Sequence, residues 1–211
     1  MRTVTTTKNV YLFEELSNIA QEHALDKYRE WMVDDPYWYT CITEDWKDRL
    51  AELGIDKPEI YFSGFYSQGD GAVFECKDID PIKLMDALNM KQDHSYIYKL
   101  LQDEAIDLSV GVSRISSTYS HEETARFNLD LYLINDDELT DGNLTLDEIE
   151  EKIHTHLNKL GDTLEYWRMD TCKEIYQALE QEYEMLQSDD VLKEIFIENE
   201  YEFTEDGEIY N

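Results

Sequence analysis

The chain is poor in the residues that build linkers, disulfide frameworks and basic surfaces. Its 211 residues include 3 prolines, 8 glycines and 3 cysteines, and 18 basic residues stand against 49 acidic ones. So little proline and glycine leaves no stretch typical of a flexible linker. We therefore expect a single acidic domain over residues 1–211, with helices and a sheet at 1–135 and a long acidic helical part with a short closing tail at 136–211.

The cysteines Cys41, Cys76 and Cys172 are far apart, odd in number and without a CxxC pair. This pattern excludes a disulfide framework and a zinc site, and we expect small core residues in a reducing compartment. The N-terminus has no apolar signal segment, and no run approaches the ~18 apolar residues of a membrane span. The sequence therefore predicts a cytoplasmic protein that makes no membrane contact and uses no cofactor or bound metal.

The excess of carboxylates gives a formal net charge of −31. A surface of this sign repels nucleic acid and anionic membranes, so we expect no direct binding to DNA or RNA. Basic proteins or divalent cations are the partners that such a surface attracts, although the charge can also serve solubility alone. Hydrophobic residues make up 42% of the chain and include 15 Tyr and 4 Trp. Interleaved acid and aromatic residues indicate a folded domain with a charged surface, not a disordered acidic tail.

Four segments have the composition of strands. Residues 60–65 and 72–76 flank the turn Gln68-Gly69-Asp70-Gly71 and predict a hairpin, and residues 106–115 and 127–134 alternate apolar and polar side chains. They predict a four-stranded antiparallel sheet with helices packed on one face, which is an α+β fold.

The spacing of apolar residues predicts helices around these strands. Apolar residues recur at three and four positions, and the predicted segments are 12–32, 36–53, 81–88, 96–101 and 145–187. The last is one long acidic helix or two collinear helices with a break at Gly161. Its start matches a capping box at Thr145 and Glu148, and Ser188 caps a short final helix. The closing residues 201–211 predict a small hairpin with Asp206 and Gly207 at its turn.

Three segments carry a resemblance to a known group of proteins. YFSGFYSQGDGAVFE (61–75), ENEYEFTEDGEIY (198–210) and FEELSNIAQEHALDKYRE (13–30) resemble a family of bacteriophage and prophage proteins that has the motif SGFxSQGDGAxFE. Its members are mostly uncharacterised and are often labelled automatically as antitoxins of toxin–antitoxin systems. Residues 116–125 depart from the His/Tyr-rich hairpin of the family and keep only Tyr119 and His121. The resemblance implies a phage origin and a location in the host cytoplasm, and it supplies no catalytic assignment.

One candidate ligand site combines the hairpin turn with the loop that follows the third strand. Its residues are Tyr66, Ser67, Gln68, Asp70, Tyr119 and His121. They place several polar groups near one turn, which suits a small hydrolase or nucleotide-binding protein. Turn chemistry is the simpler interpretation, because glycine supplies unusual backbone angles and aspartate caps turns. The segment lacks the GK[ST] of a phosphate loop and the elbow of a serine hydrolase.

The segment DDELTDGNLTLDE partly follows the spacing of an EF-hand loop. Asp137, Asp141, Gly142 and Glu148 fall at positions 1, 5, 6 and 12. Leu139 at position 3 has no ligand atom and a strand precedes the loop. A solvated connection into the long helix is therefore the preferred interpretation.

The acidic helical surface is the candidate for a partner-binding site. Its predicted contact residues are Glu148, Glu151, Glu165, Glu174, Glu180, Glu184, Glu202, Glu205 and Asp206. Carboxylates held on a helix can occupy the groove in which a basic protein binds the phosphates of DNA. The leading hypothesis is a non-enzymatic phage protein that binds and inhibits a basic host protein, such as a nuclease or other defence enzyme, by DNA mimicry. An antitoxin-like neutraliser of a cognate toxin is the first alternative and the small hydrolase is the second. The oligomeric state, including a homodimer, is left open by the sequence.

Overall fold

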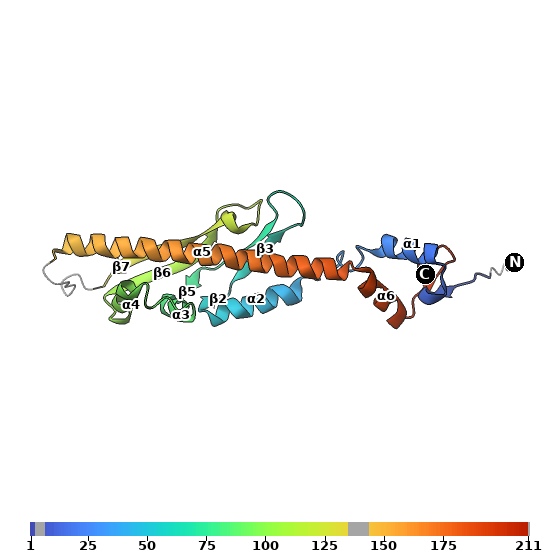
Figure 1. The fold of residues 1–211 in the computed structure, drawn as a ribbon, viewed down its shortest axis with the longest axis horizontal. Coiled ribbons are helices and arrows are strands. Elements are labelled where there is room, and N and C mark those ends of the chain that lie inside the picture. The colour runs from blue at the N-terminus through green and yellow to red at the C-terminus, as the bar shows by residue number, and fades with distance from the viewer. Residues whose placement is uncertain (3–6, 135–143, 211) are drawn as a thin grey trace. The chain divides into compact units, whose positions relative to one another are not determined.

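A computed structural model describes residues 1–2, 7–134 and 144–210 of the chain (Figure 1). The fold is α+β, as predicted. The chain divides into two compact units, which are described separately: unit 1 comprises Met1–Thr40 with Leu179–Asn211, and unit 2 comprises Cys41–Ala178. The expectation of a single domain stays a prediction.

Unit 2 contains the predicted strands as two antiparallel ladders. Strand β3 (Glu59–Ser63) pairs with β4 (Gly71–Glu75), and β6 (Ile106–Arg114) pairs with β7 (Ala125–Leu133). The predicted four-stranded sheet does not form as one ladder. Among the described residues, the two ladders join through one bridge, in which the Cys76 N–H donates to Val112 O (2.9 Å) and the Val112 N–H donates to Cys76 O (2.7 Å).

The sheet is interrupted because the chain changes partner after Cys76. Strand β5 (Asp78–Ile79) pairs with β2 (Ile55–Asp56) and makes no ladder with β6. The Cys76 sulfur lies 2.9 Å from the carbonyl oxygen of Asp56 and 3.1 Å from that of Asp78, so its thiol sits between the two short strands. The alternating pattern of residues 106–115 predicted β6 itself but contained no signal for this change of partner.

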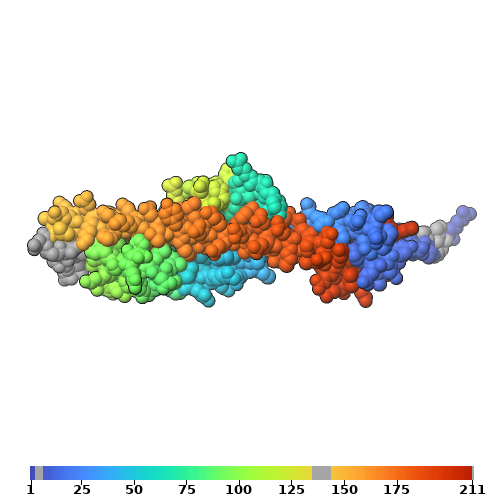
Figure 2. All heavy atoms as spheres, viewed as in Figure 1, coloured from blue at the N-terminus to red at the C-terminus, as the bar shows by residue number. Residues whose placement is uncertain are grey.

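Helix α5 (Leu146–Leu186) covers one face of both ladders in unit 2. Trp167 lies 6.2 Å from Phe74 of β4 and 6.4 Å from Phe127 of β7, measured between ring centroids. A Cβ added at Gly161 would lie 3.1 Å from Leu129 Cδ1, so the missing side chain lets the helix approach β7 closely. The helix continues without a break through Gly161, which settles the choice between one helix and two. Atoms of α5 form a continuous strip of the visible surface of unit 2 (Figure 2).

Shorter helices complete unit 2. They are α2 (Thr40–Glu52, which begins at the last residue of unit 1), α3 (Pro81–Ala87), α4 (Ser95–Gln102) and the 3-10 turn η2 (Glu122–Thr124). Asp80 caps α3, since its Oδ1 accepts from the Lys83 N–H at 2.9 Å and Pro81 occupies the first turn. No helix in the described part of the chain combines the length and apolar character that crossing a membrane requires.

Unit 1 has its own aromatic core. Its elements are β1 (Tyr11–Leu12), η1 (Phe13–Glu15), α1 (Asn18–Tyr28), α6 (Asp189–Glu198) and β8 (Glu202–Phe203). The rings of Phe13, Phe196 and Phe203 pack together with centroid distances of 5.1–5.9 Å. The predicted helix over residues 12–32 is shorter, because the Ser17 hydroxyl accepts from the Ala20 N–H and starts α1 there. Within α1, Ala20, Ala24 and Leu25 are buried, whereas Ile19 is 80% exposed.

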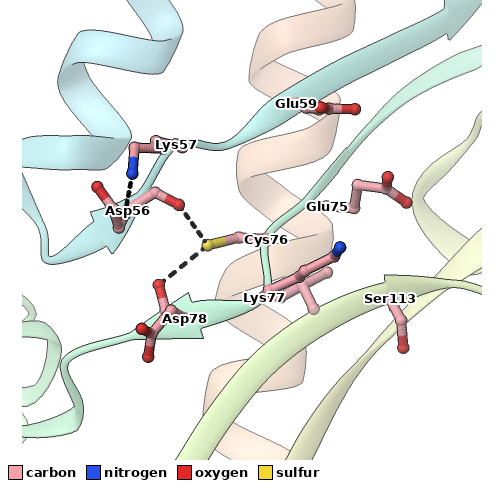
Figure 3. Close-up of a pocket in the computed structure, with 9 residues that line it drawn as sticks. Asp56, Lys57, Glu59, Glu75, Cys76, Lys77, Asp78 and Ser113 are labelled. Carbon is pink, nitrogen blue, oxygen red and sulfur yellow. Dashed lines mark hydrogen bonds and ion pairs between the residues drawn. The ribbon is translucent and has the colours of Figure 1, made fainter.

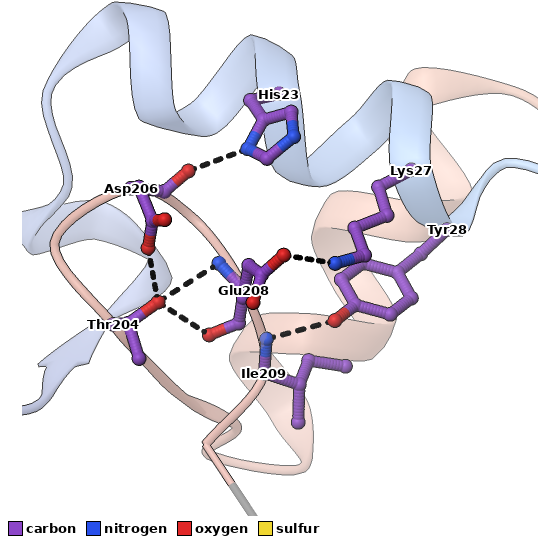
Figure 4. A network of polar contacts seen from close by, with 7 residues as sticks. All are labelled: His23, Lys27, Tyr28, Thr204, Asp206, Glu208 and Ile209. Carbon is purple, nitrogen blue, oxygen red and sulfur yellow. Dashed lines mark hydrogen bonds and ion pairs between the residues drawn. The ribbon is translucent and has the colours of Figure 1, made fainter.

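The C-terminal tail of unit 1 is docked onto α1 (Figure 4). The Tyr28 hydroxyl accepts from the Ile209 N–H at 2.8 Å, and Lys27 pairs with Glu208. His23 is exposed, and its Nδ1 lies 2.6 Å from the carbonyl oxygen of Asp206 and donates to it. Gly207 has a φ of +88° and lies against the α1 backbone, where a methyl group would overlap the carbonyl oxygen of Ala20.

We predict that Gly207→Ala releases the tail from α1. The added Cβ meets backbone at a positive φ, so we expect a loss of about 1–3 kcal/mol in the stability of unit 1. Hydrogen exchange of the α1 amides should accelerate accordingly. Gly64→Ala is the control, since its Cβ would meet only the Asp70 side chain, at 3.4 Å. Equal protection of α1 in both variants would contradict the docking.

Candidate protein-interaction surface

The predicted acidic contact residues are divided between the two units. Glu148, Glu151, Glu165 and Glu174 belong to unit 2, and Glu180, Glu184, Glu202, Glu205 and Asp206 belong to unit 1. Glu151, Glu174, Glu202 and Glu205 are exposed and Glu180 is half-buried. The predicted contact residues are therefore described with the unit to which each of them belongs.

Glu165 is part of the packing between α5 and the sheet. Its carboxylate accepts two bonds from the fully buried Arg168 side chain, at 3.1 Å from Nε and 2.6 Å from Nη2, and one from the Phe127 N–H at 3.2 Å. Burial raises the pKa of the Glu165 carboxyl, but the bonds from Arg168 and Phe127 outweigh burial and hold the pKa below its usual value. Glu165 therefore serves the fold, and its carboxylate is committed inside unit 2.

Two further predicted contact residues make local caps. Glu148 accepts from the backbone N–H of Thr145 (2.8 Å) and from its hydroxyl (2.9 Å), which confirms the capping box and lowers the pKa of Glu148. Asp206 accepts from the Thr204 hydroxyl in the tail turn, and this bond is the main reason that the pKa of Asp206 is lowered. Both carboxylates remain at the surface, but each is held by its own turn.

The sequence interpretation missed a regular acidic stripe on α6. Asp190, Glu194 and Glu198 are exposed and four residues apart, while Leu192 and Phe196 on the opposite side are buried. Ser188 caps the helix as predicted, accepting from the Val191 N–H at 3.4 Å. The four-residue spacing was the available signal. We call Asp190, Glu194 and Glu198 the α6 stripe.

Net negative charge per residue is higher in unit 1 than in unit 2. This unit contains 19 acidic and 5 basic residues, a formal charge of −14. Residues 179–210 alone contain 12 acidic residues and a single lysine, Lys193. The nearest approach of Lys193 Nζ to Asp190 is 4.0 Å. The charge is thus densest on α6 and the tail. The tail was among the predicted contact regions, whereas none of the predicted contact residues lies on α6.

The hairpin turn and the loop after β6 form a close-packed pair. A Cβ at Gly71 would lie 2.5 Å from His121 Cβ, and one at Gly69 would lie 3.4 Å from the Tyr119 ring. The two segments project together from unit 2 in Figure 2. The structure thus brings the predicted ligand-site residues near one another, but the space between the backbones at Gly71 is filled.

The individual bonds of this pair are those of turns. Asp70 Oδ2 accepts from the Ser67 N–H at 2.6 Å, and His121 Nδ1 accepts from the Glu123 N–H at 3.3 Å. Gly69 has a φ of +93°, whereas Gly71 is needed for the close approach and not for its backbone angle. Tyr66 has a φ of +73° and is 71% exposed. These contacts favour the simpler interpretation, in which the residues stabilise two turns, over a ligand site. Tyr66 is an exposed aromatic side chain at the tip of the hairpin.

An open cavity of about 480 Å³ lies beside the Cys76–Val112 bridge (Figure 3). Its wall includes Glu59 and Glu75, which face each other across the β3–β4 ladder and both lie within hydrogen-bond distance of the Tyr61 hydroxyl. The bond with Glu59 and, after it, burial raise the pKa of Tyr61 to about 12. The ring of Tyr61 also stacks on the Arg114 guanidinium, 4.1 Å from the centroid.

The described residues contain no group of three or more His, Cys, Asp or Glu side chains placed to hold a metal ion. The EF-hand-like spacing begins at Asp137, and its positions through Gly142 lie outside the described residues.

Comparison with known protein families finds a match over most of the chain. Residues 38–189 match the model of a family described as a domain of unknown function, DUF8835. The curated proteins contain no match, and neither do the solved structures. The matched residues include the whole of unit 2, strands included. They end at the first residue of α6, so nearly all of α6 and the tail lie beyond them.

We predict that Glu165→Gln destabilises unit 2 by about 2 kcal/mol at pH 7, because buried Arg168 loses its charged partner. The pKa of Glu165 is lower in the folded state, so its contribution is present above the unfolded pKa of about 4.3 and is lost as pH falls through the folded pKa. Urea unfolding should show the wild type and the variant converging below about pH 4. The exposed Glu174→Gln on the same helix is the control, and a similar loss in both variants would contradict the assignment.

Proposed function

The chain belongs to the DUF8835 family, and we propose that it is a phage protein that binds and inhibits a basic host protein by mimicking DNA. The host protein would be a defence enzyme or another nucleic-acid-binding enzyme, met in the host cytoplasm. The phage origin rests on the resemblance of the hairpin, N-terminal and C-terminal segments. The proposed role needs no catalysis by this chain.

The observation that carries the proposal is the fixed acidic array of unit 1. The opposite side of α6 packs into the core of unit 1 through Leu192 and Phe196, which are 0% and 1% exposed, and this packing fixes the position of the α6 stripe. Glu202 is held in the β1–β8 ladder opposite Leu12, and Glu205 belongs to the turn that docks on α1. An array that is ordered before binding loses little entropy when a partner engages it.

The spacing of the array suits recognition by a groove lined with Lys and Arg. Residues four apart on a helix are separated by about 6 Å along its axis, so the stripe presents a row of charges along one line. A single row is sparser than duplex DNA, which presents a charge about every 1.7 Å of axis. The tail carboxylates and the rest of unit 1 add the charge that raises the local field and steers a basic partner toward it.

We expect the neutralised stripe, Asp190→Asn with Glu194→Gln and Glu198→Gln, to weaken capture of the basic host partner by on the order of tenfold or more. Tagged protein would be expressed in the host, and the captured partner would then be titrated with duplex DNA as the competitor. Binding should fall steeply from 50 to 500 mM salt, because the Debye length is about 10 Å at 0.1 M and about 3 Å at 1 M.

The matched control removes the same charge from exposed positions of unit 2 by Asp48→Asn, Glu52→Gln and Asp93→Asn. If both triple variants weakened binding equally, the effect would come from net charge in general and not from the α6 stripe. An affinity that stays constant between 50 and 500 mM salt would overturn the proposal of DNA mimicry. So would a partner that still binds its DNA in the presence of this protein. Rescue of the host from a toxin encoded beside this gene, with no effect of the stripe variant, would point instead to an antitoxin-like role.

A further inference from the structure

We propose that the outer edge of β7 binds an extended basic segment of a protein partner, which joins the β6–β7 ladder as an added strand. The site lies in unit 2, on the side of β7 that faces away from β6. It consists of the outward backbone groups of Leu129, Leu131 and Leu133, which we call the β7 edge. The inference goes beyond the proposed function, because the contact is made through the backbone of unit 2 and not through the α6 stripe.

The hydrogen bonds of the ladder show which backbone groups of β7 point outward. Just beyond the ladder and in the same register, the Ile115 N–H donates to Thr124 O at 2.8 Å, so the even-numbered residues of β7 are the ones that bond β6. Backbone groups alternate between the two edges of an antiparallel strand, so the odd-numbered residues of β7 point away from β6. The Phe127 N–H agrees with this alternation, since it donates to the Glu165 carboxylate outside the ladder at 3.2 Å.

The backbone groups of the β7 edge have no hydrogen-bond partner among the described residues. In the same part of the chain, β6 is the strand with which β7 pairs, and no second strand lies on the outer side. Three N–H groups and three C=O groups are thus unpaired along residues 129–133. A row of unpaired backbone groups is a template for an added strand.

The β7 edge lacks the features that protect strand edges. Proteins protect an exposed edge with proline, lysine, a bulge or a very short strand. Strand β7 has nine residues, contains no Pro or Lys, and keeps a continuous register with β6. Protection against self-association comes from charge, because unit 2 contains 30 acidic and 13 basic residues, a formal charge of −17. Repulsion of this kind acts between two copies and does not oppose a basic partner.

The side chains of the β7 edge are incompletely covered. On the face that packs against α5, Leu108 and Val110 of β6 are 3% and 2% exposed. The three leucines of the β7 edge lie on the same face and are only half-buried. A strand added beside them would cover this remaining apolar surface. Residues of the partner segment that share this face should therefore be apolar.

The position of α5 favours a single extended segment over a second copy of the chain. Gly161 of α5 lies against Leu129, and Glu165 reaches the outward N–H of Phe127, so the helix lies over β7 itself. Two β7 strands paired edge to edge would be about 4.8 Å apart. Their two α5 helices would lie on the same face of the joined sheet, where packed helices need about 8–10 Å. A segment without a covering helix avoids this conflict.

The charge beside the β7 edge favours a basic segment. On the open face of β7, opposite to α5, Asp130 is exposed and lies between Leu129 and Leu131. Tyr132 on the same face is 58% exposed and offers its ring to a cation. Alternate residues of an added strand lie on this face, where Lys or Arg would be attracted. The expected occupant therefore alternates apolar and basic residues.

The test uses the full chain and a short fluorescent peptide of alternating lysine and valine. We expect saturable binding by anisotropy at about 50 mM salt. Only alternate N–H groups of an added strand face its neighbour: those of the valines in antiparallel addition and those of the lysines in parallel addition. Backbone N-methylation of one set and not the other should therefore weaken binding by about tenfold or more. Equal affinity of the two methylated peptides, or no binding of the unmodified one, would overturn strand addition.

Protein variants locate the peptide. Leu131→Pro removes an outward N–H from the middle of the β7 edge, a position at which a strand tolerates proline, and should weaken binding by about tenfold. Asp130→Lys leaves the backbone intact, and it should weaken the lysine–valine peptide and admit a glutamate–valine peptide. Asp93→Lys, at an exposed position elsewhere in unit 2, is the control for net charge. Binding that is unchanged in Leu131→Pro and equal in the two lysine variants would overturn the assignment to the β7 edge.

Sedimentation of the protein alone tests the choice of occupant. We expect a monomer, and a dimer that Leu131→Pro dissociates would show that a second copy occupies the β7 edge and would overturn the partner segment. Failure of peptide binding would leave the proposed function standing, since the α6 stripe belongs to unit 1. Loss of host capture in the stripe variant, with peptide binding unchanged, would support the β7 edge as a separate site.

Discussion

The apolar contact between α5 and one face of the β-ladders is the interaction on which unit 2 depends. Alternate residues of β6, from Ile106 to Val112, turn their side chains to that face and are nearly fully buried. The facing side of the helix is buried from Ile149 to Ile175. Neither element could expose such a face to water, since each fully buried aliphatic side chain contributes about 1.5–3 kcal/mol. The Glu165–Arg168 pair fixes the position of the helix on the ladder. The Arg168 guanidinium holds the Glu165 carboxylate where it accepts from the Phe127 N–H of β7.

That packing also decides where the acidic residues can act. Carboxylates on α5 are limited to the side that faces away from the ladders, and one residue near the boundary, Glu165, is drawn into the packing. In α6 the buried residues are Leu192 and Phe196, and the other residues of the helix are partly or fully exposed. Concentrated charge of one sign opposes folding. In unit 1 the aromatic cluster of Phe13, Phe196 and Phe203 and the docked tail offset that repulsion, and the carboxylates remain in fixed positions.

Local signals in the sequence predicted the elements, and long-range contacts decided the rest. Ser188, Asp80 and the Thr145–Glu148 pair each act through atoms a few residues away, so their caps could be derived from spacing alone. The change of strand partner after Cys76 could not be derived from spacing. Whether this stretch of chain hydrogen-bonds β2 or β6 depends on the tertiary packing around it. His23 and Gly207 show the same limit, since their roles arise from the contact of α1 with a tail more than 180 residues away. The hairpin glycines were predicted as turn residues, but the need for Gly71 came from the neighbouring loop.

The α6 stripe and the tail lie outside the part of the chain that matches the family model. That match covers residues 38–189, whereas Asp190, Glu194 and Glu198 follow it. An exposed stripe recognises charge alone, and its strength falls with salt. Recognition of this kind acts mainly on the association rate, because it steers the encounter of the two proteins. The proposed capture of a basic partner would therefore rest on residues outside the family match, and its strength would lie in fast association.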